Sequence, residues 1–149
     1  VHLVRKTEES KALNHIEGPA VIISSSGMMT GGRIVHHLRQ RLPHERNTIV
    51  LGGYMAEGTR GRILQNGSPT LRMFGQEVPI RAAIESIPGL SGHADRSGLY
   101  RWLDHLPHAP RKTFITHGEP ESSDAMAADL RNQRNWDVVC PELGQSFEL

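Results

Sequence analysis

The sequence lacks several features that mark particular classes of protein. Its single cysteine, Cys140, excludes an internal disulfide and fits a reducing compartment, so we expect a cytoplasmic protein. No apolar run approaches the ~18 residues that a membrane helix needs, and we expect no membrane partner. Aromatic residues make up 5% and hydrophobic residues 37% of the 149 residues, which is lean but sufficient for a globular core. Because the chain starts at Val1 without an initiator Met, we expect it to be part of a longer protein.

Charge is small in sum but uneven along the chain. The net charge is +1, yet residues 1–80 hold ten Lys/Arg against six Asp/Glu, a net of +4. Residues 81–149 hold seven against ten, a net of −3. This asymmetry indicates a polyanionic partner for the first half, with a solvated basic face as the alternative. The basic half includes Arg33, Arg39, Arg41, Arg46, Arg60, Arg62 and Arg72.

Short apolar runs alternate with segments of helical periodicity. The β-branched segments 19–25 and 47–53 predict buried strands, and the segment 33–42 between them predicts a helix. Further strands are predicted at 70–74, 78–87, 111–115, 136–139 and 146–149, a hairpin turn at Gly75-Gln76, and further helices at 62–65, about 99–106 and 120–133. This order of strands, loops and helices predicts an α/β fold with parallel pairing.

Two glycine-rich loops, 26–32 and 56–62, each follow a predicted strand and precede a predicted helix. Backbone N–H groups at the start of a helix attract anions, and glycines let a phosphate come close. Hydroxyl groups in the first loop, and Arg60 and Arg62 in the second, add donors and charge. Neither loop has the Gly-Lys-Ser/Thr ending of a P-loop or the dinucleotide-binding pattern, so ligand-free tight turns are the alternative.

Two of the nine histidines, His93 and His117, sit at predicted strand–helix junctions among small residues. Each is followed two residues later by a carboxylate, Asp95 or Glu119. Because α/β folds place ligand sites at the carboxyl ends of strands, the two histidines predict one shared site. Two imidazoles are too few to hold a catalytic zinc, and the sequence has no H-x-H-x-D-H cluster, H-E-x-x-H or cysteine pair. The remaining histidines are expected at the surface, in polar surroundings or at helix ends: His2, His15, His36, His37, His44, His105 and His108.

Four segments together resemble the C-terminal third of the β-CASP RNA-processing nucleases of the metallo-β-lactamase superfamily. This group includes the endonuclease subunit of the cleavage and polyadenylation specificity factor and its bacterial and archaeal relatives. The segments are IISSSGMMTGGR at 22–33, GYMAEGTRGR at 53–62, SGHAD at 91–95 and THGEP at 116–120. The resemblance implies a Rossmann-like β-CASP segment at residues 1–90, with a parallel sheet and helices on both faces. It further implies that residues 91–149 are the C-terminal βα segment of a metallo-β-lactamase fold.

The resemblance also implies roles for individual residues. His93 matches the family's motif B histidine, which protonates the leaving oxygen, and His117 matches the motif C histidine, which ligates one of two zinc ions. Asp95 and Glu119 would either orient these histidines or cap helices, with capping as the default. The glycine loops would clamp the RNA backbone through Ser25, Ser26, Gly27, Thr30, Gly31, Gly32, Arg33, Gly58, Thr59, Arg60 and Arg62.

The chain departs from the family pattern because the H-x-H-x-D-H cluster, a further His and a bridging Asp are missing. We therefore expect an RNA-binding fragment of a zinc-dependent RNA phosphodiesterase, inactive and zinc-free by itself. Its expected partners are RNA and the missing N-terminal metallo-β-lactamase segment of the same protein. Residues 91–149 would expose apolar surface and could form a homodimer.

Two other interpretations stay open. One is a Rossmann-like module that binds phosphate or single-stranded RNA without cleaving it. The other is an interaction fragment that dimerises through the exposed lactamase face. The sequence also leaves open the RNA substrate and the choice between endonuclease and 5′-exonuclease activity.

Overall fold

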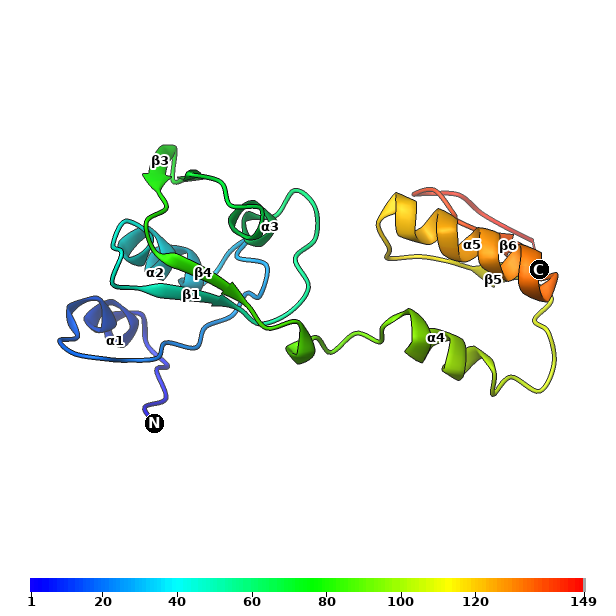
Figure 1. Ribbon diagram of the computed structural model, residues 1–149, viewed down its shortest axis with the longest axis horizontal. Helices are drawn as coiled ribbons and strands as arrows, with labels where there is room; N and C mark the ends of the chain where they lie inside the picture. Colours follow the sequence, from blue (N-terminus) through cyan, green and yellow to red (C-terminus); the bar gives the residue numbers. More distant parts are fainter. Residues whose placement is uncertain (149) are drawn as a thin grey trace. The chain divides into compact units, whose positions relative to one another are not determined.

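The computed structural model describes residues 1–148. These form two compact units, Val1–Gly92 and a second unit that begins at His93 (Figure 1). The α/β class with parallel strand pairing is confirmed, since both units combine helices with a parallel strand pair. No helix in the described part of the chain is both long enough and apolar enough to cross a membrane.

The first unit is built on one parallel strand pair and one hairpin. Its elements are α1 (Thr7–Ala12), the 3₁₀ turn η1 (Leu13–His15), α2 (Arg33–Arg41), β1 (Thr48–Leu51), α3 (Arg60–Gln65), β2 (Thr70–Met73), β3 (Gln76–Pro79), β4 (Ala83–Ser86) and η2 (Pro88–Leu90). Strands β1 and β4 are parallel, with Thr48 opposite Ala83, and β2 and β3 form an antiparallel hairpin. Figure 1 shows α2 and α3 beside the β1–β4 pair.

The core of this unit is formed by the apolar sides of its helices α2 and α3, strand β1 and the β2–β3 hairpin. Leu38 of α2, Leu51 of β1 and Leu64 of α3 are almost fully buried in one cluster with the hairpin residues Leu71 and Met73. On β1 burial alternates with the strand period, so Leu51 faces the core while Val50 is half exposed on the other face. The apolar core therefore lies on the Leu51 face of the strand pair.

The predicted strand at 19–25 is wrong. The segment has no regular structure, and Val21 and Ile23 are 89% and 94% exposed. A β-branched run becomes a strand only where another strand offers its edge, and within residues 1–148 no strand pairs with this segment.

The predicted strand at 78–87 is split into β3 and β4. Between them the N–H groups of Arg81 and Ala82 donate to the carbonyl of Leu42, at 2.8 and 3.0 Å, and so satisfy the C-terminal end of α2. After these two residues the chain continues into β4, which pairs with β1. The hairpin turn itself is Phe74-Gly75, one residue earlier than predicted, because both residues have a positive φ.

Two further expectations for the first unit need correction. Helix α1 was not among the predicted elements; the Glu9 carboxylate accepts hydrogen bonds from the N–H groups of Arg5 and Lys6 at its start. His37, expected at the surface, is 6% exposed and lies 3.0 Å from the Ser10 hydroxyl of α1. Burial, with a smaller contribution from Arg41, lowers the pKa of His37.

The second unit comprises α4 (Arg96–Leu103), β5 (Thr113–Phe114), α5 (Pro120–Arg134) and β6 (Val138–Val139). Strands β5 and β6 are parallel, and α5 packs over them through Ala127 and Leu130. Arg134 pairs with Asp104 at 2.5 Å and so links α5 to the end of α4. The strand predicted at 146–149 is irregular from 146 to 148, and Leu149 lies outside the described residues.

Helix α4 packs less than its periodicity suggests. Leu103 is buried in the core of the second unit, but Trp102 is 66% exposed and Leu99 and Leu106 are also open to solvent. The second unit therefore does expose an apolar strip, as expected for residues 91–149.

Candidate functional site

The structure brings His93 and His117 together. Their ring centroids lie 6.1 Å apart with the planes tilted by 45°, and both residues are exposed. His93 lies three residues before α4, and His117 lies beyond the end of β5, whose last pairing bond runs from the Ile115 N–H to the Val139 carbonyl at 2.9 Å. Two solvent-accessible imidazoles thus meet at the carboxyl end of a parallel strand, where α/β folds place ligand sites.

The turn that presents His117 depends on its neighbour Gly118. His117 has a left-handed backbone with φ of 66°. A Cβ on Gly118 would lie 2.4 Å from the Ser123 hydroxyl oxygen, which is far below van der Waals contact. Ser123 is nearly buried in the first turns of α5. The close approach of this helix to the turn therefore favours glycine at 118, next to the histidine.

The two predicted carboxylates behave differently. Asp95 is the N-cap of α4: its Oδ1 accepts from the Gly98 N–H at 2.7 Å and from the Ser97 hydroxyl at 2.9 Å. These bonds, the Gly98 N–H foremost, lower the pKa of Asp95 because they stabilise the ionised carboxylate. Glu119 occupies the N-cap position of α5, but its side chain makes no capping hydrogen bond there.

The histidine pair does not by itself complete a metal site. Zinc in proteins takes three or four side-chain ligands, and residues 1–148 contain no group of three or more His, Cys, Asp or Glu that could hold a metal ion. Two imidazoles can supply part of a zinc ligand set, so the remaining ligands would have to come from other residues.

The first glycine loop is held in shape by its own contacts and by Arg60. The hydroxyls of Ser26 and Thr30 lie 3.3 Å apart within the loop. From the second loop, Arg60 Nη1 donates to the carbonyls of Met29 and Thr30 at 3.2 and 3.1 Å. Arg60, predicted to contact phosphate, thus also ties the two loops together.

Several predicted RNA-binding groups in the first loop lie around the start of α2. Gly32, with φ of 77°, is the N-cap of α2, and Arg33 Nη1 donates to the Val4 carbonyl at 2.9 Å. Ser25 and Gly27 are exposed in the same loop, as is Gly31 in part. The loop backbone is therefore open to solvent where the prediction places phosphate.

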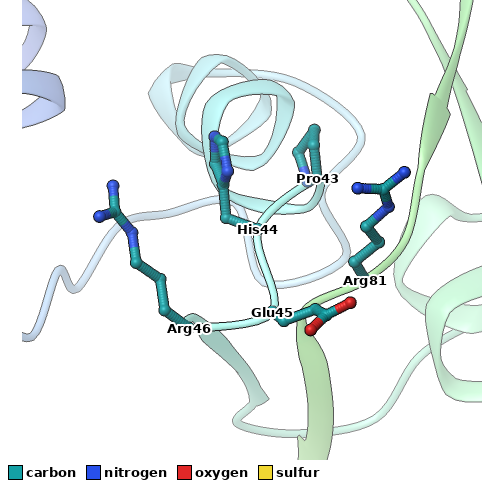
Figure 2. Close-up of a pocket in the computed structure, with 5 residues that line it drawn as sticks. All are labelled: Pro43, His44, Glu45, Arg46 and Arg81. Atoms are coloured by element: carbon teal, nitrogen blue, oxygen red, sulfur yellow. The ribbon is translucent and has the colours of Figure 1, made fainter.

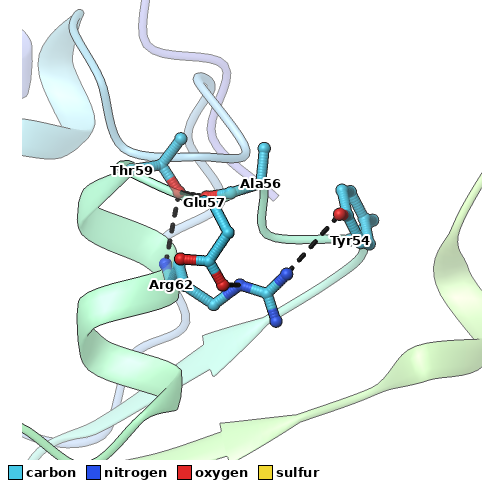
Figure 3. A network of polar contacts seen from close by, with 5 residues as sticks. All are labelled: Tyr54, Ala56, Glu57, Thr59 and Arg62. Atoms are coloured by element: carbon cyan, nitrogen blue, oxygen red, sulfur yellow. Dashed lines mark hydrogen bonds and ion pairs between the residues drawn. The ribbon is translucent and has the colours of Figure 1, made fainter. Parts of the chain in front are cut away.

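The second glycine loop is organised by Thr59 and Arg62 (Figure 3). The Thr59 hydroxyl donates to the Ala56 carbonyl at 2.6 Å and accepts from the Arg62 N–H at 3.2 Å, which caps α3. The Arg62 guanidinium pairs with Glu57 at 3.1 Å and lies 5.6 Å from the centre of the Tyr54 ring. Arg62 therefore has protein partners already, and its predicted contact with RNA phosphate stays a prediction.

The structure also groups several basic residues in a shallow, open basic hollow that sequence reasoning missed. It is lined by Pro43, His44, Glu45, Arg46 and Arg81, at the turn that leads from α2 into β1 (Figure 2). This position is at the amino ends of β1 and β4, whereas the second glycine loop follows the carboxyl end of β1. Arg81 is remote from the other four residues in sequence, so no local pattern could have grouped them.

Comparison with protein families agrees with this arrangement. Residues 1–64 match the model of the Beta-Casp domain, and residues 77–141 match that of the Zn-dependent metallo-hydrolase RNA specificity domain. These matches cover both glycine loops and both histidines of the candidate site.

The chain is also similar to several much longer proteins. Ribonuclease TTHA0252 of Thermus thermophilus is 41% identical over 149 residues, which is 100% of this chain and 33% of the relative. Transcription termination factor FttA of Pyrococcus abyssi is 34% identical over 137 residues, 89% of this chain and 21% of the relative. FttA of Methanocaldococcus jannaschii is 38% identical over 121 residues, which is 78% of this chain and 19% of the relative. The chain thus spans a third or less of these relatives, and it belongs to the β-CASP family of metallo-β-lactamase-type RNA-processing proteins.

Proposed function

We propose that this chain is the RNA-binding part of a zinc-dependent RNA phosphodiesterase, to which it supplies His93 and His117. The observation that carries the proposal is the meeting of the two exposed imidazoles, 6.1 Å apart, in a chain of the β-CASP family. The remaining zinc ligands would come from chain beyond these 149 residues, which is in keeping with the greater length of the relatives.

In this proposal the two histidines have different tasks. His117 offers a neutral ring nitrogen as one ligand of the metal set, and zinc would supply a Lewis acid for the phosphate. His93 holds a proton at a ring nitrogen and passes it to the oxygen that leaves when the phosphodiester breaks. The first unit, with its net positive charge and its two tied loops, holds the RNA backbone in place.

A chimera tests this proposal. This chain would replace the matching third of the Thermus thermophilus ribonuclease, with which it aligns along its whole length. We expect the chimera to cleave RNA and the variant His93→Gln to lose roughly a hundredfold or more in rate with RNA affinity unchanged, since general acids contribute about 10²–10⁴. His117→Asn should lower the zinc content; asparagine tolerates the left-handed backbone at 117. A His93→Gln chimera with full activity would contradict the assignment.

A non-catalytic RNA-binding module is the second candidate. The observation that favours it is that the two glycine loops of the first unit are already formed and tied together by Arg60. The chimera separates the two candidates, because a chimera that binds RNA but never cleaves it would support the module.

A further inference from the structure

The tip of the β2–β3 hairpin carries a residue that its backbone does not favour. Phe74 and Gly75 form the two-residue turn, with φ of 51° and 77°. Turns with two positive φ values ordinarily carry Asn-Gly, Asp-Gly or Gly-Gly, because a bulky side chain is strained in the left-handed region. The needs of the turn therefore do not explain an aromatic residue at 74.

The needs of the core do not explain it either. The buried residues of the hairpin are Leu71, Met73 and Val78, whereas Phe74 is 50% exposed. An unfavourable conformation retained at an exposed position is an observation that points toward a binding role.

The Phe74 ring is contacted by a histidine and an arginine of α2. The His36 ring stacks on it with centroids 5.0 Å apart and planes inclined by 30°, and the Arg39 guanidinium carbon lies 5.5 Å from the ring centre. Arg39 also donates to the Gln76 side chain at 3.3 Å, across the same turn. His36 and Arg39 are one helical turn apart on α2, so both approach the ring from the helix side. The ring is thus held in place while half of the residue stays open to solvent.

The surroundings favour a nucleic-acid base over a protein partner. Within α2 and the hairpin, all of which the structure describes, Phe74 is the one large apolar residue that is exposed. Protein-docking surfaces present contiguous apolar patches, whereas single aromatic rings flanked by cations are typical platforms for the bases of single-stranded nucleic acids. The unit Val1–Gly92 holds eleven Lys/Arg against seven Asp/Glu, a net of +4, which suits a polyanion.

We propose that Phe74, supported by His36 and Arg39, is a stacking platform for a base of single-stranded RNA bound to the first unit. The inference rests on the proposed function, since it presumes that the chain binds RNA. It adds a site outside both glycine loops and remote in sequence from the two histidines. Stacking accepts any base, so this platform contributes affinity without sequence preference.

The test is the variant Phe74→Asn in the full 149-residue chain. Asparagine suits the left-handed turn, so we expect its Tm to match or exceed that of the unaltered chain. Loss of the ring should lower the affinity for oligouridine about fivefold or more by fluorescence anisotropy. An abasic oligoribose phosphate of equal length should bind both chains equally. The salt dependence should not change, because no charge is removed.

Three further variants complete the experiment. Phe74→Tyr keeps an aromatic ring and should retain affinity within about twofold, whereas Phe74→Leu keeps apolar bulk without the ring and should show the same loss as asparagine. Trp102→Ala removes an exposed aromatic ring from the second unit and serves as the matched control, with no loss expected.

The outcomes separate this inference from the proposed function. Equal oligouridine affinity for Phe74→Asn, or an equal loss on the abasic chain, would overturn the platform and leave a protein contact as the role of Phe74. A lowered Tm for Phe74→Asn would also overturn the platform, because it would show that phenylalanine is retained at position 74 for its packing against His36 and Arg39. If the unaltered chain bound neither ligand, the RNA-binding proposal itself would fail.

Discussion

The contact between Arg60 and the first glycine loop leads to a quantitative prediction. Arg60 Nη1 donates to the carbonyls of Met29 and Thr30 at 3.2 and 3.1 Å, thirty-one and thirty residues away in sequence. A net hydrogen bond contributes about 0.5–1.5 kcal/mol, and more from a charged donor, so Arg60→Ala should cost about 1–2 kcal/mol of unfolding free energy. If Arg60 also contacts a phosphate, its removal lowers the slope of log affinity against log salt by ~0.7, the value for one contact with a single strand.

Two assays and two comparison variants separate these roles. Urea unfolding gives the stability, and anisotropy titrations with single-stranded RNA at several salt concentrations give the slope. Arg60→Gln keeps an N–H donor without the charge, so it should retain most of the stability yet show the smaller slope. Arg41→Ala is the matched control, because Arg41 donates a hydrogen bond of 2.5 Å to the Leu13 carbonyl, outside both glycine loops. This variant should lose stability while the slope of log affinity against log salt stays unchanged. Unchanged stability in Arg60→Ala would refute the structural tie, and an unchanged slope would refute the phosphate contact.

Two further predictions follow from the buried histidine and from the His117 turn. Burial and the neighbouring Arg41 lower the pKa of His37 below its ordinary value of 6.5, so the unfolded chain takes up the proton first as pH falls. The stabilising contribution of neutral His37 is therefore present above about pH 6.5 and decreases as the pH falls below that value. Tm should accordingly be higher at pH 7.5 than at pH 5.5, and His37→Gln should reduce this difference in Tm. Gly118→Ala should cost roughly 1 kcal/mol, because its methyl group would meet the Ser123 hydroxyl. Adding Ser123→Ala should restore most of that loss, since the nearest remaining side-chain atom lies 3.7 Å away; strictly additive losses in urea unfolding would contradict the steric argument.

Helices α2, α3, α4 and α5 were predictable from the sequence because their signals are local, whereas α1 was not predicted. Helix α2 begins after Gly32 and ends before Pro43, and α5 begins with Pro120 and ends at Asn135, which takes the left-handed conformation. Asp95 as the N-cap of α4 is a signal of the same kind. Each of these boundaries depends on residues within one turn of the helix end.

The strands were harder to predict because a strand depends on its partner. The run at 19–25 has the composition of a strand but no neighbouring edge within residues 1–148. The run at 78–87 is divided by hydrogen bonds from Arg81 and Ala82 to Leu42, which lies 39 and 40 residues earlier. The meeting of His93 and His117 could be predicted from their similar positions before helices. The Arg60 tie, the Phe74 platform and the basic hollow at Arg81 could not, because each joins residues far apart in the sequence.

The most direct test of the central claim follows both imidazoles in one zinc titration. The claim is that His93 lies beside the metal position that His117 helps to bind, so in the chimera the ring ¹H–¹³C NMR signals of both histidines should shift together, with the same affinity, as Zn²⁺ is added. His105, whose Nδ1 lies 2.6 Å from the Arg101 carbonyl, is an internal control in the same unit and should not follow them. His117→Asn should abolish the response of His93. A response of one histidine alone, or of the two at different zinc concentrations, would contradict the shared site.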